Sequence, residues 1–261
     1  MDLRKSKFIL PNLFTLSSVL FGLLSVIWSM EGTSEAFRRA ALAIVMAAIA
    51  DGLDGRVARM TRTETKFGVQ LDSLADVLSF GMAPAVLAYA FALRQVDAGS
   101  GYIGVGLSFL YVACGAMRLA RFNVQSERSR TPSNFFTGLP IPGAAGIVAT
   151  LVWTCVDLEM DEATRTLLMG GAMLSVAMLM VSSVRYRNFK HVHMSSIGKA
   201  MILVLMLLVL VAVLKTRASV VLLGLGTTYV LLGPSEWLLK LAWKIRFRHR
   251  RRSASGPQDH L

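Results

Sequence analysis

Two pairs of aspartates lie at helical spacing in an otherwise apolar part of the chain. Asp51 and Asp54 are three residues apart, and Asp72 and Asp76 are four residues apart. Residues at these spacings share one face of a helix, so each pair presents two carboxylates in the same direction. An ionisable residue at the centre of a membrane costs about 2.5–3.5 kcal/mol on insertion scales, so four unpaired aspartates would cost about 10 kcal/mol. The aspartates therefore need a compensating charge.

Three kinds of compensation are open. The aspartates can form salt bridges with Arg56 or Arg59, can relay protons or sodium ions, or can hold a divalent metal. Four carboxylates face few nearby cations, and hard oxygen ligands are those that Mg²⁺, Mn²⁺ and Ca²⁺ prefer. A relay would more often spread its acids across the depth of the membrane. The clustering favours metal, and metal beside arginines and glycines suits phosphate chemistry, in which a spare carboxylate takes a proton from an attacking hydroxyl.

The elements that must position these aspartates are predicted to be membrane helices. The chain has 261 residues, of which 54% are hydrophobic, and it contains repeated apolar runs close to the ~20 residues that cross a bilayer. We predict an all-α, polytopic membrane protein with about eight transmembrane helices. The predicted spans are 12–30, 36–58, 69–93, 102–122, 140–157, 164–183, 199–214 and 218–237, and for the shorter 140–157 and 199–214 the alternative is a re-entrant or interfacial segment.

The two aspartate pairs fall at facing ends of consecutive predicted spans. The polar segment between them contains Arg56, Arg59, Arg62 and Lys66 and predicts a short turn. A helical hairpin with this turn has antiparallel neighbours, so the four carboxylates can converge near one surface of the membrane. We predict a single catalytic membrane domain over residues 1–240, followed by a basic cytoplasmic tail over residues 241–261.

The basic residues predict the orientation. Of the 28 Lys and Arg residues, 22 lie in the start of the chain, in alternate loops and in the tail. With eight spans these segments share one side, so both termini and the aspartates are predicted to be cytoplasmic. The same distribution argues against nucleic-acid binding as the reason for the net charge of +12, because the charge follows the sides of the membrane rather than one soluble face.

The aspartates and their small and basic neighbours form a longer signature. Its positions are Asp51, Asp54, Gly55, Ala58, Arg59, Gly68, Asp72 and Asp76. These residues match the signature of the CDP-alcohol phosphotransferase family at every fixed position, and the chain resembles that family. The segments 11–22, 71–85, 118–123 and 136–145 are similar to the bacterial and archaeal members that use L-serine as acceptor. The resemblance covers most of the first 150 residues.

The resemblance implies the helical bundle of that family and transfer of a phosphatidyl group from CDP-diacylglycerol to L-serine in a prokaryotic cytoplasmic (inner) membrane. It implies that two divalent ions, Mg or Mn, are held by Asp51, Asp54, Asp72 and Asp76, and that Asp76 is also the general base. It implies that CDP-diacylglycerol is bound by Asn12, Thr15, Gly55, Arg59, Thr65 and Gly68.

An acceptor with a carboxylate requires a cation near the metal. Arg118 and Arg121 end the fourth predicted span, lie three apart on one helical face, and precede Asn123. Either the arginines only anchor the helix at the cytoplasmic surface, or at least one pairs bidentately with the serine carboxylate. We predict that these three residues bind serine.

Other activities remain as alternatives. Glycerol phosphate, inositol phosphate or choline could replace serine, although a phosphorylated acceptor needs more cations than the segment 118–123 supplies. A cation-coupled transporter would explain buried acids but not the spacing of Gly55, Arg59 and Gly68. Two further questions stay open: whether the 124–142 segment is a structured turn or a lid, and whether glycines serve a homodimer or packing within one chain. These glycines are Gly104, Gly106, Gly224 and Gly226.

Overall fold

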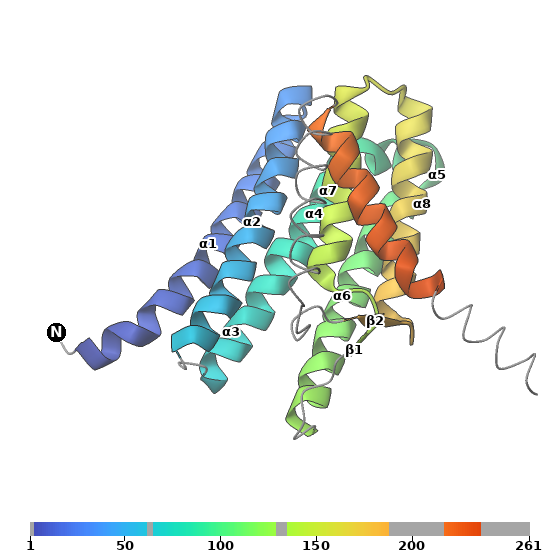
Figure 1. The fold of residues 1–261 in the computed structure, drawn as a ribbon. Coiled ribbons are helices and arrows are strands. Elements are labelled where there is room, and N and C mark those ends of the chain that lie inside the picture. The colour runs from blue at the N-terminus through green and yellow to red at the C-terminus, as the bar shows by residue number, and fades with distance from the viewer. Residues whose placement is uncertain (1–2, 62–64, 129–134, 188–216, 236–261) are drawn as a thin grey trace, which may run out of the picture.

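The computed structural model of the protein describes residues 3–61, 65–128, 135–187 and 217–235. Within these residues the chain is a bundle of long helices with one short pair of strands at one end (Figure 1). The labelled helices are α1 (Leu3–Glu31), α2 (Ser34–Thr61), α3 (Lys66–Asp76), η1 (Val77–Met82), α4 (Ala83–Ala88), η2 (Tyr89–Leu93), α5 (Arg94–Ser100), α6 (Ile103–Arg128), α7 (Ile141–Asp157) and α8 (Glu162–Val181). A further helix, orange in Figure 1, spans Ala218–Ser235 and is called helix 218–235 below.

The predicted helical membrane fold is confirmed. Each predicted span other than 199–214 overlaps a helix, and 199–214 and the predicted tail lie outside the described residues. Among the described helices, five are long and apolar enough to cross a membrane by length and composition, and α7 is a shorter apolar helix. The length of α2 is also sufficient, but charged residues lie towards both of its ends. The number of eight crossings stays a prediction.

The helix that carries the second aspartate pair is longer and less regular than predicted. Its five segments follow one another without a break from Lys66 to Ser100. Two of them, η1 and η2, are π-helical turns, a feature that is frequent at functional sites, and η1 begins directly after Asp76. The hydroxyl of the buried Tyr111 on α6 donates a hydrogen bond to the Phe80 carbonyl in η1 at 2.9 Å. This contact fixes α6 against the turn that follows Asp76.

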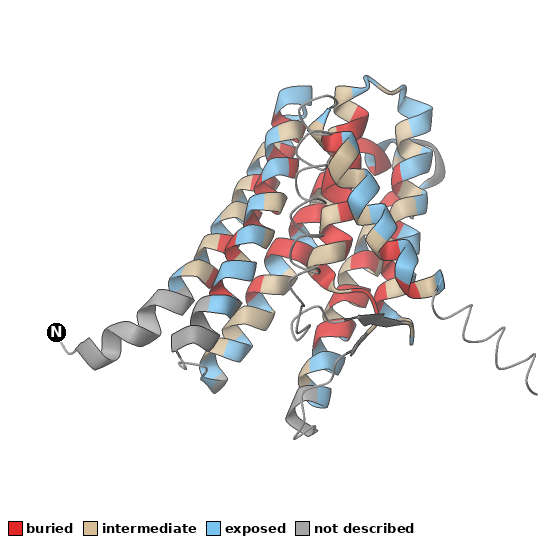
Figure 2. Cartoon of the chain, in the orientation of Figure 1, coloured by how far each residue is buried: buried red, intermediate tan, exposed pale blue. Residues whose placement is uncertain are grey.

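The interior of the bundle is centred on α7. Most side chains of α7 are buried, and it packs against α2 and α8. Figure 2 shows that buried residues line the inner faces of the helices, while exposed residues lie outside. Because α7 runs through this interior, the segment 140–157 is a core helix rather than an interfacial one.

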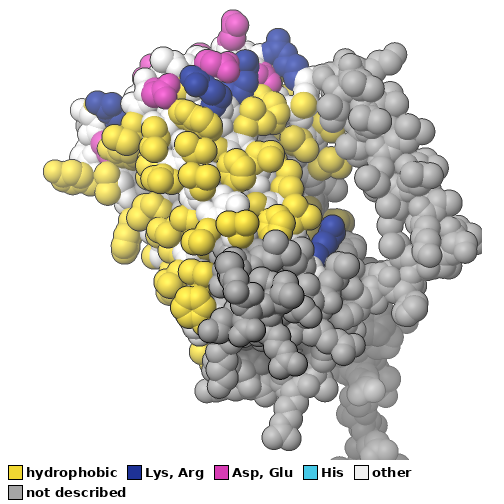
Figure 3. All heavy atoms as spheres, turned by 90° about the vertical axis from the view of Figure 1, so that its left-hand side faces the viewer, with side chains coloured by type: hydrophobic (Ala, Val, Ile, Leu, Met, Phe, Trp, Pro, Cys, Tyr) yellow, Lys and Arg dark blue, Asp and Glu magenta, His cyan; other side chains and the backbone are white. Residues whose placement is uncertain are grey.

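Charged side chains cap one end of the bundle, above a band of apolar side chains (Figure 3). At this end a guanidinium nitrogen of Arg38 on α2 lies 3.0 Å from a carboxylate oxygen of Asp157 on α7. The other oxygen of Asp157 accepts a hydrogen bond from the Ser219 hydroxyl at 2.6 Å. These contacts join three helices at the end remote from the aspartate pairs.

The short loop between α7 and α8 lies at the same end. Asp161 caps α8 by accepting hydrogen bonds from the Thr164 backbone N–H at 2.9 Å and the Thr164 hydroxyl at 2.7 Å. These bonds lower the pKa of the Asp161 carboxyl from its ordinary value, because they favour the charged form. The exposed carboxylate also faces the positive end of the helix dipole.

Two short antiparallel strands lie at the other end of the bundle. β1 (Phe135–Thr137) pairs with β2 (Arg185–Arg187). The backbone then turns at Gly138, whose φ of 81° and close approach to the Met180 carbonyl exclude a side chain. The described part of the predicted 124–142 loop is therefore the end of α6, a strand and the start of α7, with 129–134 outside the described residues.

Close packing of α1 against η1 depends on a glycine. A Cβ added at Gly22 would lie 2.9 Å from the backbone Cα of Ser79. Beside this point the Ser79 hydroxyl donates a hydrogen bond to the Ser18 carbonyl at 2.9 Å. The backbones of α1 and η1 therefore lie close together just beyond Asp76.

We expect Gly22→Ala to lower the free energy of unfolding by about 1–3 kcal/mol, because the added methyl group must displace backbone in a packed core. The matched control is Gly171→Ala on α8, where no heavy atom from the described part of the chain lies within 4 Å of the added Cβ. The control should be neutral or stabilising, since alanine favours helix over glycine by about 0.5–1 kcal/mol. Denaturant unfolding in detergent measures both variants, and equal stabilities would contradict the packing argument.

Candidate metal centre

Three carboxylates converge where α2 and α3 lie side by side. Asp51 comes from α2, and Asp72 and Asp76 come from successive turns of α3. One carboxylate oxygen from each of the three lies within 4.8 Å of the other two. All three residues are half-buried. The predicted convergence of the two helix faces is therefore present for three of the four aspartates.

Asp54 has a different environment. It is buried, and one of its carboxylate oxygens accepts a hydrogen bond from the Thr15 hydroxyl on α1. Thr15 is buried as well. Asp54 lies one turn after Asp51 on α2, and its hydrogen bond with Thr15 shows that its carboxylate lies against α1. The described geometry thus groups Asp51 with the α3 pair and connects Asp54 to α1.

The three grouped carboxylates fit a divalent cation. The Oδ1 atom of Asp76 is buried and has no hydrogen-bond partner among the described residues. The charges of Asp51 and Asp72 both repel the charge of Asp76. A buried oxygen without a donor and a cluster of like charges are each unfavourable in a low-dielectric site. A hard cation such as Mg²⁺ or Mn²⁺ relieves both, because carboxylate oxygens are its preferred ligands.

Among the described residues, Arg118 on α6 is a cation whose charge acts on these carboxylates. Its side chain is buried at 8% exposure, and its charge attracts that of Asp76. The guanidinium carbon lies 5.5 Å from the ring centre of Phe122. The Nε atom is buried and makes no hydrogen bond to any described residue. Arg118 therefore retains a donor that a bound anion can use.

The other two predicted acceptor residues point elsewhere. Arg121 is exposed and lies near the end of α8, where its guanidinium donates to the Val181 carbonyl at 3.4 Å. Asn123 donates through Nδ2 to the Ser73 hydroxyl at 2.9 Å. Ser73 lies between the two aspartates of α3, so this bond joins α6 to the segment that carries these carboxylates. Of the three, the structure brings Arg118 to the carboxylates.

The residues predicted to contact the nucleotide lie around the same hairpin. Thr65 is the N-cap of α3, and its hydroxyl accepts a hydrogen bond from the Gly68 amide at 3.0 Å. Thr15 contacts Asp54, as described above. Asn12 belongs to α1, and Gly55 and Arg59 belong to α2; the side-chain surroundings of these three positions lie outside the described part of the structure. α2 continues to Thr61, so Arg56 and Arg59 are helical rather than part of the predicted turn.

One residue near the site was not predicted from the sequence. Tyr229 on helix 218–235 lies against the start of α7, with its Cε1 atom 3.6 Å from the position of a Cβ at Gly143. It is close enough to Arg118 for the charges of the two groups to interact when the tyrosine is ionised. No local pattern in the sequence separates Tyr229 from the other residues of an apolar helix. Its position depends on how helix 218–235 packs.

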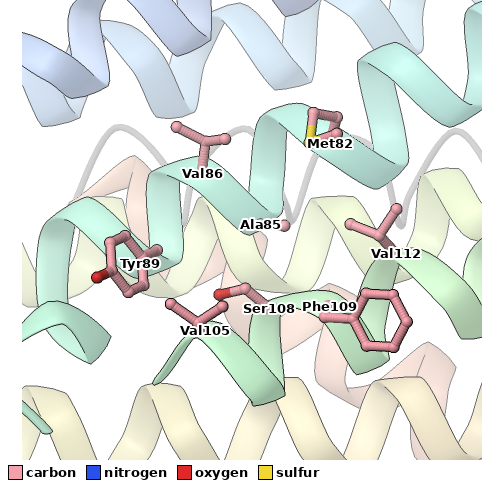
Figure 4. A pocket seen from close by; sticks show the side chains of 8 residues that line it. All are labelled: Met82, Ala85, Val86, Tyr89, Val105, Ser108, Phe109 and Val112. Carbon is pink, nitrogen blue, oxygen red and sulfur yellow. The ribbon is translucent and has the colours of Figure 1, made fainter. Parts of the chain in front are cut away.

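A separate apolar groove lies between the middle of the α3–α5 helix and the first half of α6 (Figure 4). Its volume is about 290 Å³. The residues that line it are Met82, Ala85, Val86, Tyr89, Val105, Ser108, Phe109 and Val112. The lining has no carboxylate and no cation, so the groove is not part of the metal centre.

Comparison with known proteins defines the class. A family model described as CDP-alcohol phosphatidyltransferase matches residues 8–180. A CDP-diacylglycerol–serine O-phosphatidyltransferase of Helicobacter pylori is 41% identical over 231 residues, which are 88% of this chain and 92% of that protein. An archaetidylserine synthase of Methanothermobacter thermautotrophicus is 38% identical over 68% of this chain and 69% of its own length. A Bacillus subtilis CDP-diacylglycerol–serine O-phosphatidyltransferase is 30% identical over 69% of this chain and 91% of its own length.

The helical membrane bundle, the carboxylate cluster and these matches place the protein among membrane-embedded transferases. The chain belongs to the CDP-alcohol phosphatidyltransferase family. The resemblance drawn from the signature residues is thereby confirmed.

We expect Mn²⁺ to raise the thermal midpoint of the detergent-solubilised protein, because a ligand at 100 times its Kd stabilises the folded state by about 2.7 kcal/mol. Asp72→Asn should lose most of this shift, since it removes one charge from the cluster. Asp161→Asn is the matched control at the opposite end, where asparagine can still cap α8. A full shift in Asp72→Asn would contradict metal binding at this cluster.

Proposed function

We propose that the protein transfers the phosphatidyl group of CDP-diacylglycerol to L-serine, giving phosphatidylserine and CMP. The observation that carries the proposal is the buried Arg118 beside the carboxylate cluster of the family signature. The names of the relatives that cover most of the chain support the same substrates.

The metal ligands in this proposal are the four aspartates of the signature. Asp51, Asp72 and Asp76 supply the grouped oxygens, and Asp54 completes the set from the next turn of α2. Two ions, Mg²⁺ or Mn²⁺, are proposed. When bound, such ions neutralise the diphosphate and make the phosphorus a better electrophile. The Thr15 hydroxyl orients Asp54 by its hydrogen bond.

The base in this proposal is Asp76. Its carboxylate takes the proton of the serine hydroxyl as the serine oxygen forms a bond to the phosphorus that carries diacylglycerol. The bond from that phosphorus to the CMP oxygen breaks, and CMP leaves with the bonding electrons. Arg118 supplies a positive charge near Asp76 during this step.

Substrate positioning is divided between the two sides of the hairpin. The proposed contacts to CDP-diacylglycerol come from Asn12, Thr15, Gly55, Arg59, Thr65 and Gly68. Of these, Thr65 already bonds the Gly68 amide, which holds the first turn of α3 in place. Arg118 is proposed to bind the serine carboxylate through its planar fork of donors. Asn123 supports this pocket through its bond to Ser73 on α3. Arg121 donates to the Val181 carbonyl at the end of α8 and has no part in the proposed pocket.

The setting in the cell completes the proposal. We place the protein in the inner membrane of a prokaryote, with both termini, the site and the tail 241–261 on the cytoplasmic side. The catalytic domain spans residues 1–240.

A homodimer is also proposed. A Cβ added at Gly104 or Gly226 would meet Leu93 or Ile147 within the chain, whereas no heavy atom of the described residues lies within 4 Å of a Cβ at Gly106 or Gly224. The latter two leave room for a second copy, and light scattering in detergent measures its presence.

We expect Asp76→Asn to lower kcat for phosphatidylserine formation by about 10²–10⁴-fold, the usual contribution of a general base. The assay follows radiolabelled serine into lipid with purified protein, CDP-diacylglycerol and saturating Mn²⁺. Asp161→Asn serves as control and should retain full activity. Activity in Asp76→Asn equal to that of the unchanged protein would remove Asp76 as the base. Product with glycerol phosphate, inositol phosphate or choline, but none with serine, would remove the serine assignment.

Arg118→Gln should raise the KM for serine about tenfold or more, because a hydrogen bond to a charged group contributes about 1.5–3 kcal/mol. Arg121→Gln is the matched control on the same helix face, and its KM should stay within about threefold, because an exposed charge contributes little. The KM for CDP-diacylglycerol should not change in either variant. Equal effects of the two substitutions would show that Arg118 has no special role in acceptor binding.

A further inference from the structure

Helix 218–235 lies outside the part of the chain that matches the family model, yet it packs along the central helix α7. Three contacts fix its register. Ser219 bonds Asp157 at one end at 2.6 Å, a Cβ at Gly226 would lie 2.9 Å from Ile147, and Tyr229 lies against Gly143. The residue numbers rise along one helix as they fall along the other, so the two helices are antiparallel.

This register brings Tyr229 to the first turn of α7, and α6 also packs against this turn. A Cβ at Gly115 on α6 would lie 2.7 Å from the Cδ1 atom of Ile141. Arg118 is one helical turn beyond Gly115 and points toward the interior, where it is buried. The start of α7 therefore has Arg118 on one neighbour and Tyr229 on the other. The two groups are close enough for their charges to interact when the tyrosine is ionised, which agrees with this placement.

A buried arginine needs its orientation held if it is to bind a carboxylate through two parallel donors. Phe122 contacts the guanidinium face of Arg118, but a ring face does not fix rotation within the guanidinium plane. A neutral phenol oxygen is a hydrogen-bond acceptor, and an acceptor in that plane does fix the rotation. Tyr229 is half-buried and packed against the core, so its ring is itself held in position.

We propose that Tyr229 is a positioning residue for Arg118, and that helix 218–235 thereby sets the preference of the site for an alcohol that carries a carboxylate. The inference rests on the proposed function, because it assigns the partner of the residue that binds serine there. It adds a residue from outside the aspartate signature to the acceptor pocket. In this proposal Tyr229 acts on Arg118 and not on the reacting atoms, so its effect should fall on acceptor binding.

The test compares serine with serinol, an amino alcohol that lacks the carboxylate, in the unchanged protein and in Tyr229→Phe. We expect Tyr229→Phe to raise the KM for serine about tenfold, with kcat within about threefold and the KM for CDP-diacylglycerol unchanged. The ratio of kcat/KM for serine to that for serinol should fall by the same factor. Because this ratio is internal to each preparation, it does not depend on the fraction of protein that is folded. Tyr102→Phe, an exposed tyrosine at the far end, is the matched control.

A double-mutant cycle separates positioning from a general structural role. In an Arg118→Gln background, Tyr229→Phe should cause no further loss of serine preference, since the residue it positions is gone. An equal loss with serine and serinol, a loss that persists in that background, or a change below twofold would each overturn the inference. The unchanged protein gives the reference: if it forms phosphatidylserine, such results reject the role of Tyr229 alone, and if it forms none, the proposed function fails and the inference falls with it.

Discussion

Mutual repulsion among three carboxylates within 4.8 Å of one another is the constraint on which the rest of the structure depends. In a membrane bundle this repulsion is weakly screened, so the surrounding helices must hold the aspartates together against it. Two contacts between neighbouring helices serve this purpose. Gly22 allows α1 to touch η1, and the buried Tyr111 hydroxyl holds α6 on the same turn. Close packing on either side of Asp76 keeps the three carboxylates together.

The buried polar contacts near the cluster each join two helices. The hydroxyl of Thr15 on α1 bonds Asp54 on α2, and Asn123 on α6 bonds Ser73 on α3. Each contact satisfies polar groups that would otherwise be costly in a low-dielectric interior, which makes the relative positions of the helices specific. Arg118 differs because one of its donors keeps no partner among the described residues. That donor makes Arg118, rather than its neighbours, the proposed binding site for the acceptor carboxylate.

The remote end of the bundle also matters for the site. Arg38, Asp157 and Ser219 join α2, α7 and helix 218–235 there. Helix 218–235 packs along α7, so a contact at one end of α7 helps to set the register between the two helices. The position of Tyr229 at the other end follows from this register. The chemistry proposed at the metal centre thus depends on contacts that lie on the opposite side of the bundle.

The sequence by itself determined the helices, the pairing of Asp72 with Asp76 on one face and the family signature, because hydropathy and helical period are local properties. Tertiary structure decided that Asp54 turns to Thr15 and that Arg118, but not Arg121, meets the carboxylates. Spacing places both arginines on one face, but they differ in depth along the helix by about 4.5 Å, so only the deeper one is buried. The π turns, the strand pair and the register of Tyr229 depend on contacts between distant segments, which no local pattern encodes.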